Sequence, residues 1–114
     1  MTLLEELKLR IGSLSDRFSE PELNGFIESA KNSLGIEEVD IADRSLVLDM
    51  SHLFLLRAVL GDFDRYYSFR HSDTSFDRTA TYRNLLNFYR SLGAEIREKY
   101  PAKLSKIQIE GEEV

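Results

Sequence analysis

The sequence predicts an all-α protein, a small four-helix bundle-like domain with a long loop between helices three and four and an extended C-terminal tail. Apolar residues recur at spacings of three and four along most of the chain, and residues that cap helix N-termini stand before several of these runs. No repeat of fixed period, low-complexity tract or linker divides the 114 residues. We therefore expect one helical domain over residues 1–100 and a tail over residues 101–114.

The first two helices have marked boundaries. Thr2 and Glu5 form a capping box for a short first helix, which Gly12 is expected to end in a left-handed conformation. The box formed by Ser19 and Glu22 predicts a second helix over residues 20–34, followed by a glycine stop.

The third helix is expected to form the core, because apolar residues fall almost all round it. We expect it to begin at Ala42 or Asp43 after a connecting loop. Gly61 is a poor helix former, but aromatic residues continue the same spacing beyond it, which predicts that the helix runs through Gly61. The apolar residues of its first part are Leu46, Val47, Met50, Leu53, Phe54, Val59 and Leu60.

A polar loop is predicted between Ser68 and Arg78, because small polar residues replace the apolar spacing there. A fourth helix should begin near Asp77 or Thr79, tolerate an internal Gly93 and end before Pro101. The residues expected to be buried on this helix are Tyr82, Leu85, Leu86, Tyr89, Leu92 and Ile96.

Composition narrows the classes of function. The chain has no cysteine, and its net charge of −5 argues against general nucleic-acid binding, which needs a clustered basic surface. No apolar run is long enough to cross a bilayer, and the acidic first residues do not resemble a secretion signal, so we expect neither membrane insertion nor secretion.

The charge is unevenly distributed along the chain. Residues 1–56 hold five Lys or Arg against eleven Asp or Glu, whereas residues 57–97 hold seven Arg against five acids. Codon bias in the genome would account for the use of Arg rather than Lys in residues 57–97 as well as a functional role would. Arginine also suits planar pairing and aromatic stacking, as in protein interfaces.

No residues predict a catalytic or cofactor site. The only histidines, His52 and His71, have no metal-ligand spacing, and we expect His52 to be a structural histidine with its hydrogen bonds satisfied. His71 lies near Asp73, which leaves open a small enzyme using this pair. The scattered glycines form no phosphate loop, and the aspartates between residues 62 and 77 lack calcium-loop spacing. We expect no bound metal and no cofactor.

The candidate functional residues are those of a protein-binding surface. Two aromatic residues lie in the polar loop, where they either anchor a partner or pack locally, and Tyr and Arg are frequent at interface hot spots. The tail is apolar and alternating, so it either pairs with the strand edge of another subunit or is disordered. The predicted protein-binding residues are Phe69, Arg70, Phe76, Arg78, Leu104, Ile107 and Ile109.

The order of these features resembles the helical head-tail connector, or adaptor, proteins of long-tailed bacteriophages and prophages. The resemblance covers nearly the whole chain but rests on pattern and order rather than on a diagnostic motif. The segments that carry it are Leu3-Leu4-Glu5-Glu6-Leu7-Lys8, Asp16-x-Phe18-x-x-x-Glu22-Leu23, Asn32-x-Leu34-Gly35-Ile36, Tyr67-Ser68, Asp73-Thr74-Ser75-Phe76-Asp77 and Arg83-Asn84-Leu85-Leu86-x-x-Tyr89.

The resemblance implies a structural subunit without enzymatic activity. Such a subunit joins a ring that docks on the phage portal and bridges it to tail-side connector proteins, with DNA passing through the ring. It is found in the virion neck, and in the host cytoplasm during assembly. Its loop and termini rearrange as subunits join, and acidic and Arg-bearing halves can pair between neighbours in a head-to-tail ring. A non-catalytic binding or regulatory module of a bacterial cell is the alternative.

Overall fold

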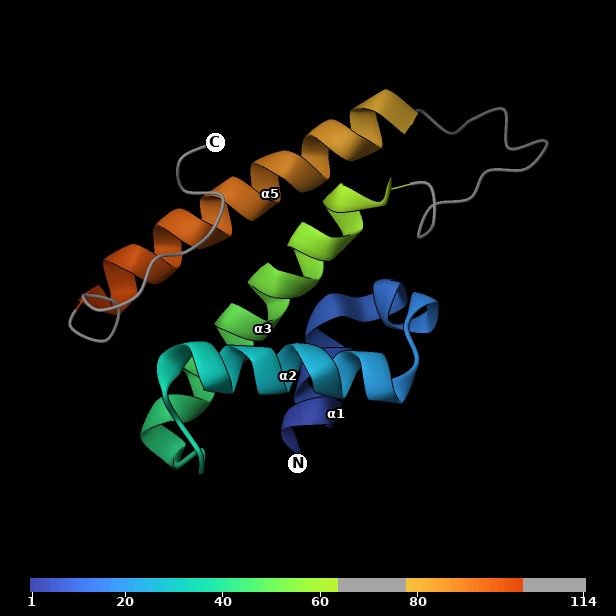
Figure 1. Ribbon diagram of the computed structural model, residues 1–114. Helices are drawn as coiled ribbons and strands as arrows, with labels where there is room; N and C mark the ends of the chain where they lie inside the picture. Colours follow the sequence, from blue (N-terminus) through green and yellow to red (C-terminus); the bar gives the residue numbers. More distant parts are fainter. Residues whose placement is uncertain (64–77, 102–114) are drawn as a thin grey trace.

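The computed structural model describes residues 1–63 and 78–101, with the side chain of Arg78 excepted, and everything below concerns these residues. They form four α-helices and one 3-10 helix, and they contain no strand, which confirms the predicted all-α bundle (Figure 1). The elements are α1 (Leu3–Ile11), η1 (Gly12–Arg17), α2 (Glu20–Leu34), α3 (Ile41–Gly61) and α5 (Arg78–Lys99).

The start of α1 is fixed by the predicted capping box. The Thr2 hydroxyl accepts the Glu5 amide at 3.1 Å, and the Glu5 carboxylate accepts the Thr2 amide at 2.8 Å. The hydrogen bond from the Thr2 amide, and then the interaction with the Thr2 hydroxyl, lower the pKa of the Glu5 carboxylate below its usual value. Gly12 ends the helix, but with φ 63° and ψ −133° it lies outside the left-handed helical region that we expected. The chain continues directly into η1, a 3-10 turn that the sequence pattern did not predict.

The bounds of α2 agree with the prediction. Ser19 accepts the Glu22 amide at 3.2 Å, and the Glu22 carboxylate accepts the Ser19 amide at 2.8 Å. At the other end Gly35 adopts the left-handed conformation, φ 70° and ψ 29°, in which a Cβ is unfavourable. The Ile36 amide then bonds the Lys31 carbonyl at 2.9 Å, so the last turn is closed as well.

The bounds of α3 differ from the prediction at both ends. The carboxylate of Asp40 accepts the Asp43 amide at 2.9 Å, so Asp40 is the N-cap and the helix begins at Ile41. Gly61 is the last residue of α3, and the predicted unbroken continuation beyond it is wrong, because Asp62 has non-helical dihedrals of −142° and 63°. The Asp62 amide bonds the carbonyls of Ala58 and Val59 and so closes the final turn. The predicted course beyond residue 63 lies outside the described residues.

The core is organised around α3, as its apolar residues predicted. α1, α2 and α5 all pack against α3, and Figure 1 shows α2 crossing it while α5 runs back along it. Each fully buried Leu, Ile or Val contributes about 2 kcal/mol relative to an exposed one. The largest fully buried apolar side chains are Leu7, Leu23, Leu46, Val47, Met50, Leu53, Leu55, Leu56, Val59 and Ile96.

One face of α5 joins this core. Tyr89, Leu92 and Ile96 are buried as predicted, but Tyr82 is 38% exposed, and its ring meets that of Phe63 edge-on at 5.3 Å. Gly93 is buried within the helix, where an added Cβ would lie 3.8 Å from Leu53, an ordinary contact. The helix ends at Lys99, before Pro101 as expected.

Candidate protein-interaction surface

A groove lies between α2 and α3 on the surface of the bundle. Its volume is about 300 Å³, and we call it the α2–α3 groove. The groove arises because two exposed serines on α2 are too short to fill the space beside larger residues of α3. Its lining residues are Phe26, Ser29, Ser33, Phe54, Arg57 and Ala58.

The groove combines aromatic surface with a positive charge. Phe26 is half-buried and its ring meets that of Phe18 edge-on, with centroids 5.6 Å apart. Across the groove the Arg57 guanidinium carbon lies 5.0 Å from the centre of the Phe54 ring, which is cation–π geometry. Such a surface suits an apolar ligand that also carries a carboxylate.

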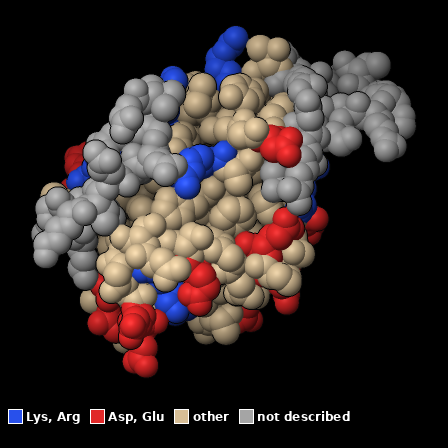
Figure 2. Space-filling view, viewed as in Figure 1, with Lys and Arg blue, Asp and Glu red and all other residues tan. Residues whose placement is uncertain are grey.

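One face of the molecule is poor in charge. Figure 2 shows a broad area of uncharged residues in the middle of this face, with a basic side chain at its centre and acidic side chains along its lower and right-hand edges. Single exposed apolar residues are normal on a soluble surface, but a continuous uncharged area is typical of contact surfaces. The exposed large apolar side chains among the described residues are Met1, Leu9, Ile41, Tyr82 and Phe88.

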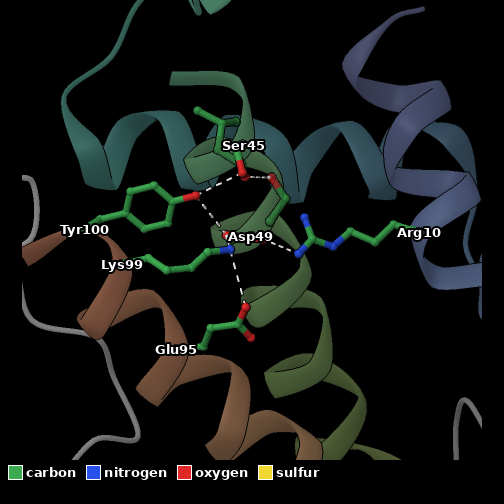
Figure 3. A network of polar contacts seen from close by, with 8 residues as sticks. Arg10, Ser45, Asp49, Glu95, Lys99 and Tyr100 are labelled. Carbon is green, nitrogen blue, oxygen red and sulfur yellow. Dashed lines mark hydrogen bonds and ion pairs between the residues drawn. The ribbon is translucent and has the colours of Figure 1, made fainter. Parts of the chain in front are cut away.

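A second feature is a polar network centred on Asp49, which is only 2% exposed (Figure 3). Arg10 of α1 forms an ion pair with one carboxylate oxygen. The other oxygen accepts a hydrogen bond from the Tyr100 hydroxyl at 3.2 Å and lies 3.7 Å from the Lys99 ammonium. Tyr100 has only one hydroxyl hydrogen, which it donates to Asp49. In the hydrogen bond between the Ser45 and Tyr100 hydroxyls, 2.9 Å long, Ser45 is therefore the donor.

This network joins three helices. Asp49 comes from the middle of α3, Arg10 from α1, and Lys99 and Tyr100 from the end of α5. Lys99 also bonds Glu95 one turn earlier, at 3.3 Å. The Asp49 carboxylate, together with the hydrogen bond to Glu95, raises the pKa of Lys99 above its usual value. The point at which the chain leaves α5 is therefore tied to both α1 and α3.

His52 lies one turn further along α3 and is also buried, at 5% exposed. We expected both ring nitrogens of His52 to be hydrogen-bonded. This is wrong for Nδ1, which has no hydrogen-bond partner among the described residues. The ring instead meets Phe88 edge-on at 5.2 Å. Burial, and then the positive charge of Arg10, lower the pKa of His52 to about 4, while the Asp49 carboxylate opposes this shift. The imidazole is therefore neutral at physiological pH.

Most of the predicted interaction residues lie outside the part of the chain that the structure describes. Phe69, Arg70 and Phe76, and likewise Leu104, Ile107 and Ile109, lie outside the described residues. Arg78 is the first residue of α5, but its side chain is not described. The His71 and Asp73 pair of the enzyme alternative also lies outside. Within residues 1–63 and 79–101, no group of three or more His, Cys, Asp or Glu could hold a metal ion.

The groove residues were not predicted as a site. The helical spacing of Phe26 and Phe54 indicated core positions, and both side chains do pack partly against the core. The available signal was the position of Ser29 and Ser33, three and seven residues after Phe26, which places short polar residues beside an aromatic one.

Comparison with known proteins identifies no relative. No family model, no curated protein and no solved structure matches the chain. Among the described helices, none has the length and apolar character required to span a bilayer.

Proposed function

We propose that this protein is a structural head-tail connector subunit of a long-tailed bacteriophage or prophage. In this role it assembles as a ring on the phage portal and bridges the portal to tail-side proteins. It binds proteins and carries out no chemical reaction. The resemblance in the order of its sequence features supports the proposal, and so does the small all-α bundle that these features form.

The observation that carries the proposal is the position of α5 between the two predicted interaction segments. The segment containing Phe69 and Phe76 precedes this helix, and residues 101–114 follow it. Its 22 residues, at about 1.5 Å per residue, put the points at which the two segments join the helix about 33 Å apart. A subunit with contact segments at both ends of such a helix can engage two different neighbours, which a connector must do.

The described surface adds support for protein binding. The α2–α3 groove presents two aromatic rings and one arginine, a combination enriched at protein interfaces. The strongly acidic residues 1–56 and the Arg-bearing residues 57–97 offer complementary charges to neighbours in a head-to-tail ring.

Measurement of molar mass tests the proposal. The purified chain is analysed alone and after mixing with the portal protein encoded beside its own gene, by light scattering after size exclusion. We expect a portal complex containing many copies of the chain, visible as a ring by electron microscopy. Persistent failure to bind this portal, with both proteins folded, would contradict the proposal. Adjacent capsid and tail genes would support it independently.

The enzyme alternative predicts a different result. If His71 and Asp73 act on a substrate, His71→Ala abolishes the function of the protein. A connector with the same substitution keeps its portal binding nearly unchanged. Binding by a His71→Ala variant at wild-type affinity therefore separates these two functions.

A further inference from the structure

We infer that the α2–α3 groove is an intramolecular docking site for residues 107–110 of the same chain, whose sequence is Ile-Gln-Ile-Glu. The contact would hold the C-terminal segment on the bundle of the free protein. It does not depend on the connector role proposed above.

The chemistry of the groove matches this segment. In an extended peptide alternate side chains point to the same side, so Ile107 and Ile109 can both face Phe26 and Phe54. Glu110 follows directly and brings a carboxylate to Arg57, whose charge lies over the Phe54 ring. The volume of about 300 Å³ is at the small end of ligand pockets, so it suits a few side chains.

The network at Asp49 sets the starting point of the segment. Tyr100 is held beside Ser45, with 2.9 Å between their hydroxyl oxygens. Phe54 lies nine residues after Ser45, which is two and a half helical turns. The groove is therefore about 14 Å further along α3 and on its opposite side, across a helix about 10 Å wide.

The length of the chain after Tyr100 covers this separation. At about 3.3 Å per residue, Ile107 can reach about 23 Å from Tyr100 and Ile109 about 30 Å. Both distances exceed the about 14 Å along α3 and about 10 Å across it that separate Tyr100 from the groove. Leu104 can reach only about 13 Å from Tyr100, so it falls short of the groove. A short tether also gives an effective concentration in the millimolar range, which favours the segment of the same chain over that of a neighbour in dilute solution.

Crosslinking of introduced cysteines tests this contact in the full chain. The protein contains no cysteine, so each introduced pair is unique. One variant combines Ser33→Cys at the groove with Gln108→Cys, and its matched control combines Ser91→Cys with Gln108→Cys. Ser91 is exposed on α5, nine residues before Tyr100, so it lies at a similar distance along the bundle without lining the groove. A short bismaleimide is added at micromolar protein concentration.

We expect intramolecular crosslinking of the Ser33→Cys pair at least ten times faster than that of the control pair. Adding Ile107→Ser and Ile109→Ser should reduce the rate to that of the control, and Arg57→Glu should reduce it severalfold. Circular dichroism of each variant verifies that the bundle is intact. Equal rates for the two pairs would overturn the inference. A product consisting mainly of covalent dimers would also overturn it, because the groove would then bind the segment of another copy.

Discussion

Arg10 of α1 pairs with the carboxylate of Asp49, which is buried in the middle of α3. A buried charge is stable only when it is paired and hydrogen-bonded, and here partners arrive from both α1 and the end of α5. Asp49 therefore links α1 and the end of α5 to the central helix α3.

Removing the partner of Asp49 should destabilise the fold more than neutralising Asp49 itself. Arg10→Met leaves a buried carboxylate with weaker compensation, and we expect it to reduce the free energy of unfolding by about 3 kcal/mol. Asp49→Asn leaves no buried charge and should cost about 1 kcal/mol. Urea denaturation followed by circular dichroism measures both.

A surface ion pair provides the control. Glu28 pairs with Lys31 on α2, and the Glu28 side chain is 61% exposed. Glu28→Gln should change the free energy of unfolding by less than about 0.5 kcal/mol. If Arg10→Met had an effect as small as this control, Asp49 would not be a buried charge that depends on Arg10.

The buried His52 should make stability depend on pH. Its pKa is about 4 in the folded protein against 6.5 when exposed, so the folded state favours the neutral ring. The stability that this difference provides is present above pH 6.5 and is lost as the pH falls towards 4. The loss reaches about 3 kcal/mol at about pH 4.

Comparison with His52→Leu isolates this contribution. Carboxylates also titrate in this range, but they are common to both proteins. The pH dependence of the difference between the two unfolding free energies therefore reports the protonation of His52. Between pH 7.5 and pH 4 the wild type should lose about 3 kcal/mol more than the variant. Parallel pH profiles would show that the imidazole is accessible to protons in the folded state.

The sequence predicted those helix ends that are determined by local chemistry. Ser19 with Glu22, and Gly35, set the bounds of α2 through contacts within a few residues, so the pattern was sufficient. The start of α3 was misplaced because Asp40 and Asp43 are both acidic residues that can stand at a helix start, and the side chain of Asp40 accepts the Asp43 amide. Its end was missed because aromatic spacing continues past Asp62, although the backbone turns there.

The groove could not be predicted from periodicity. Phe26 and Phe54 have the spacing of core residues, and only the packing of α2 on α3 shows that Ser29 and Ser33 leave a space beside them. The unsatisfied Nδ1 of His52 is likewise a consequence of tertiary packing. The polarity of a residue is visible in a sequence, but whether it finds a partner is not.

The N-cap of α2 provides a test of local stabilisation. Ser19→Ala removes the acceptor for the Glu22 amide, and we expect a loss of about 1 kcal/mol in the free energy of unfolding. Ser33→Ala, at an exposed position near the other end of the same helix, should have no effect or be slightly stabilising. Equal effects of the two substitutions would contradict the capping role of Ser19.

Glycines should respond to alanine according to their conformation. A Cβ at Gly25 meets nothing within 4 Å, and one at Gly93 lies 3.8 Å from Leu53, which is an ordinary contact. Since both are inside helices, Gly25→Ala and Gly93→Ala should each stabilise the protein by about 1 kcal/mol. Gly35→Ala should destabilise it by about 1 kcal/mol, because φ is +70° there. In thermal melts, the melting temperatures of Gly25→Ala and Gly93→Ala should lie above that of the wild type, and that of Gly35→Ala should lie below it.

The last prediction concerns the segment before α5. If Phe69 and Phe76 anchor a partner, replacing both with Ser should leave helix content and melting temperature nearly unchanged while weakening portal binding at least tenfold. Ser72→Ala combined with Ser75→Ala changes the same segment without removing aromatic surface, and it should bind as wild type does. A fall of more than about 10 °C in the melting temperature of the Phe variant would indicate instead that these rings are part of the packed core, since buried Phe side chains each contribute several kcal/mol.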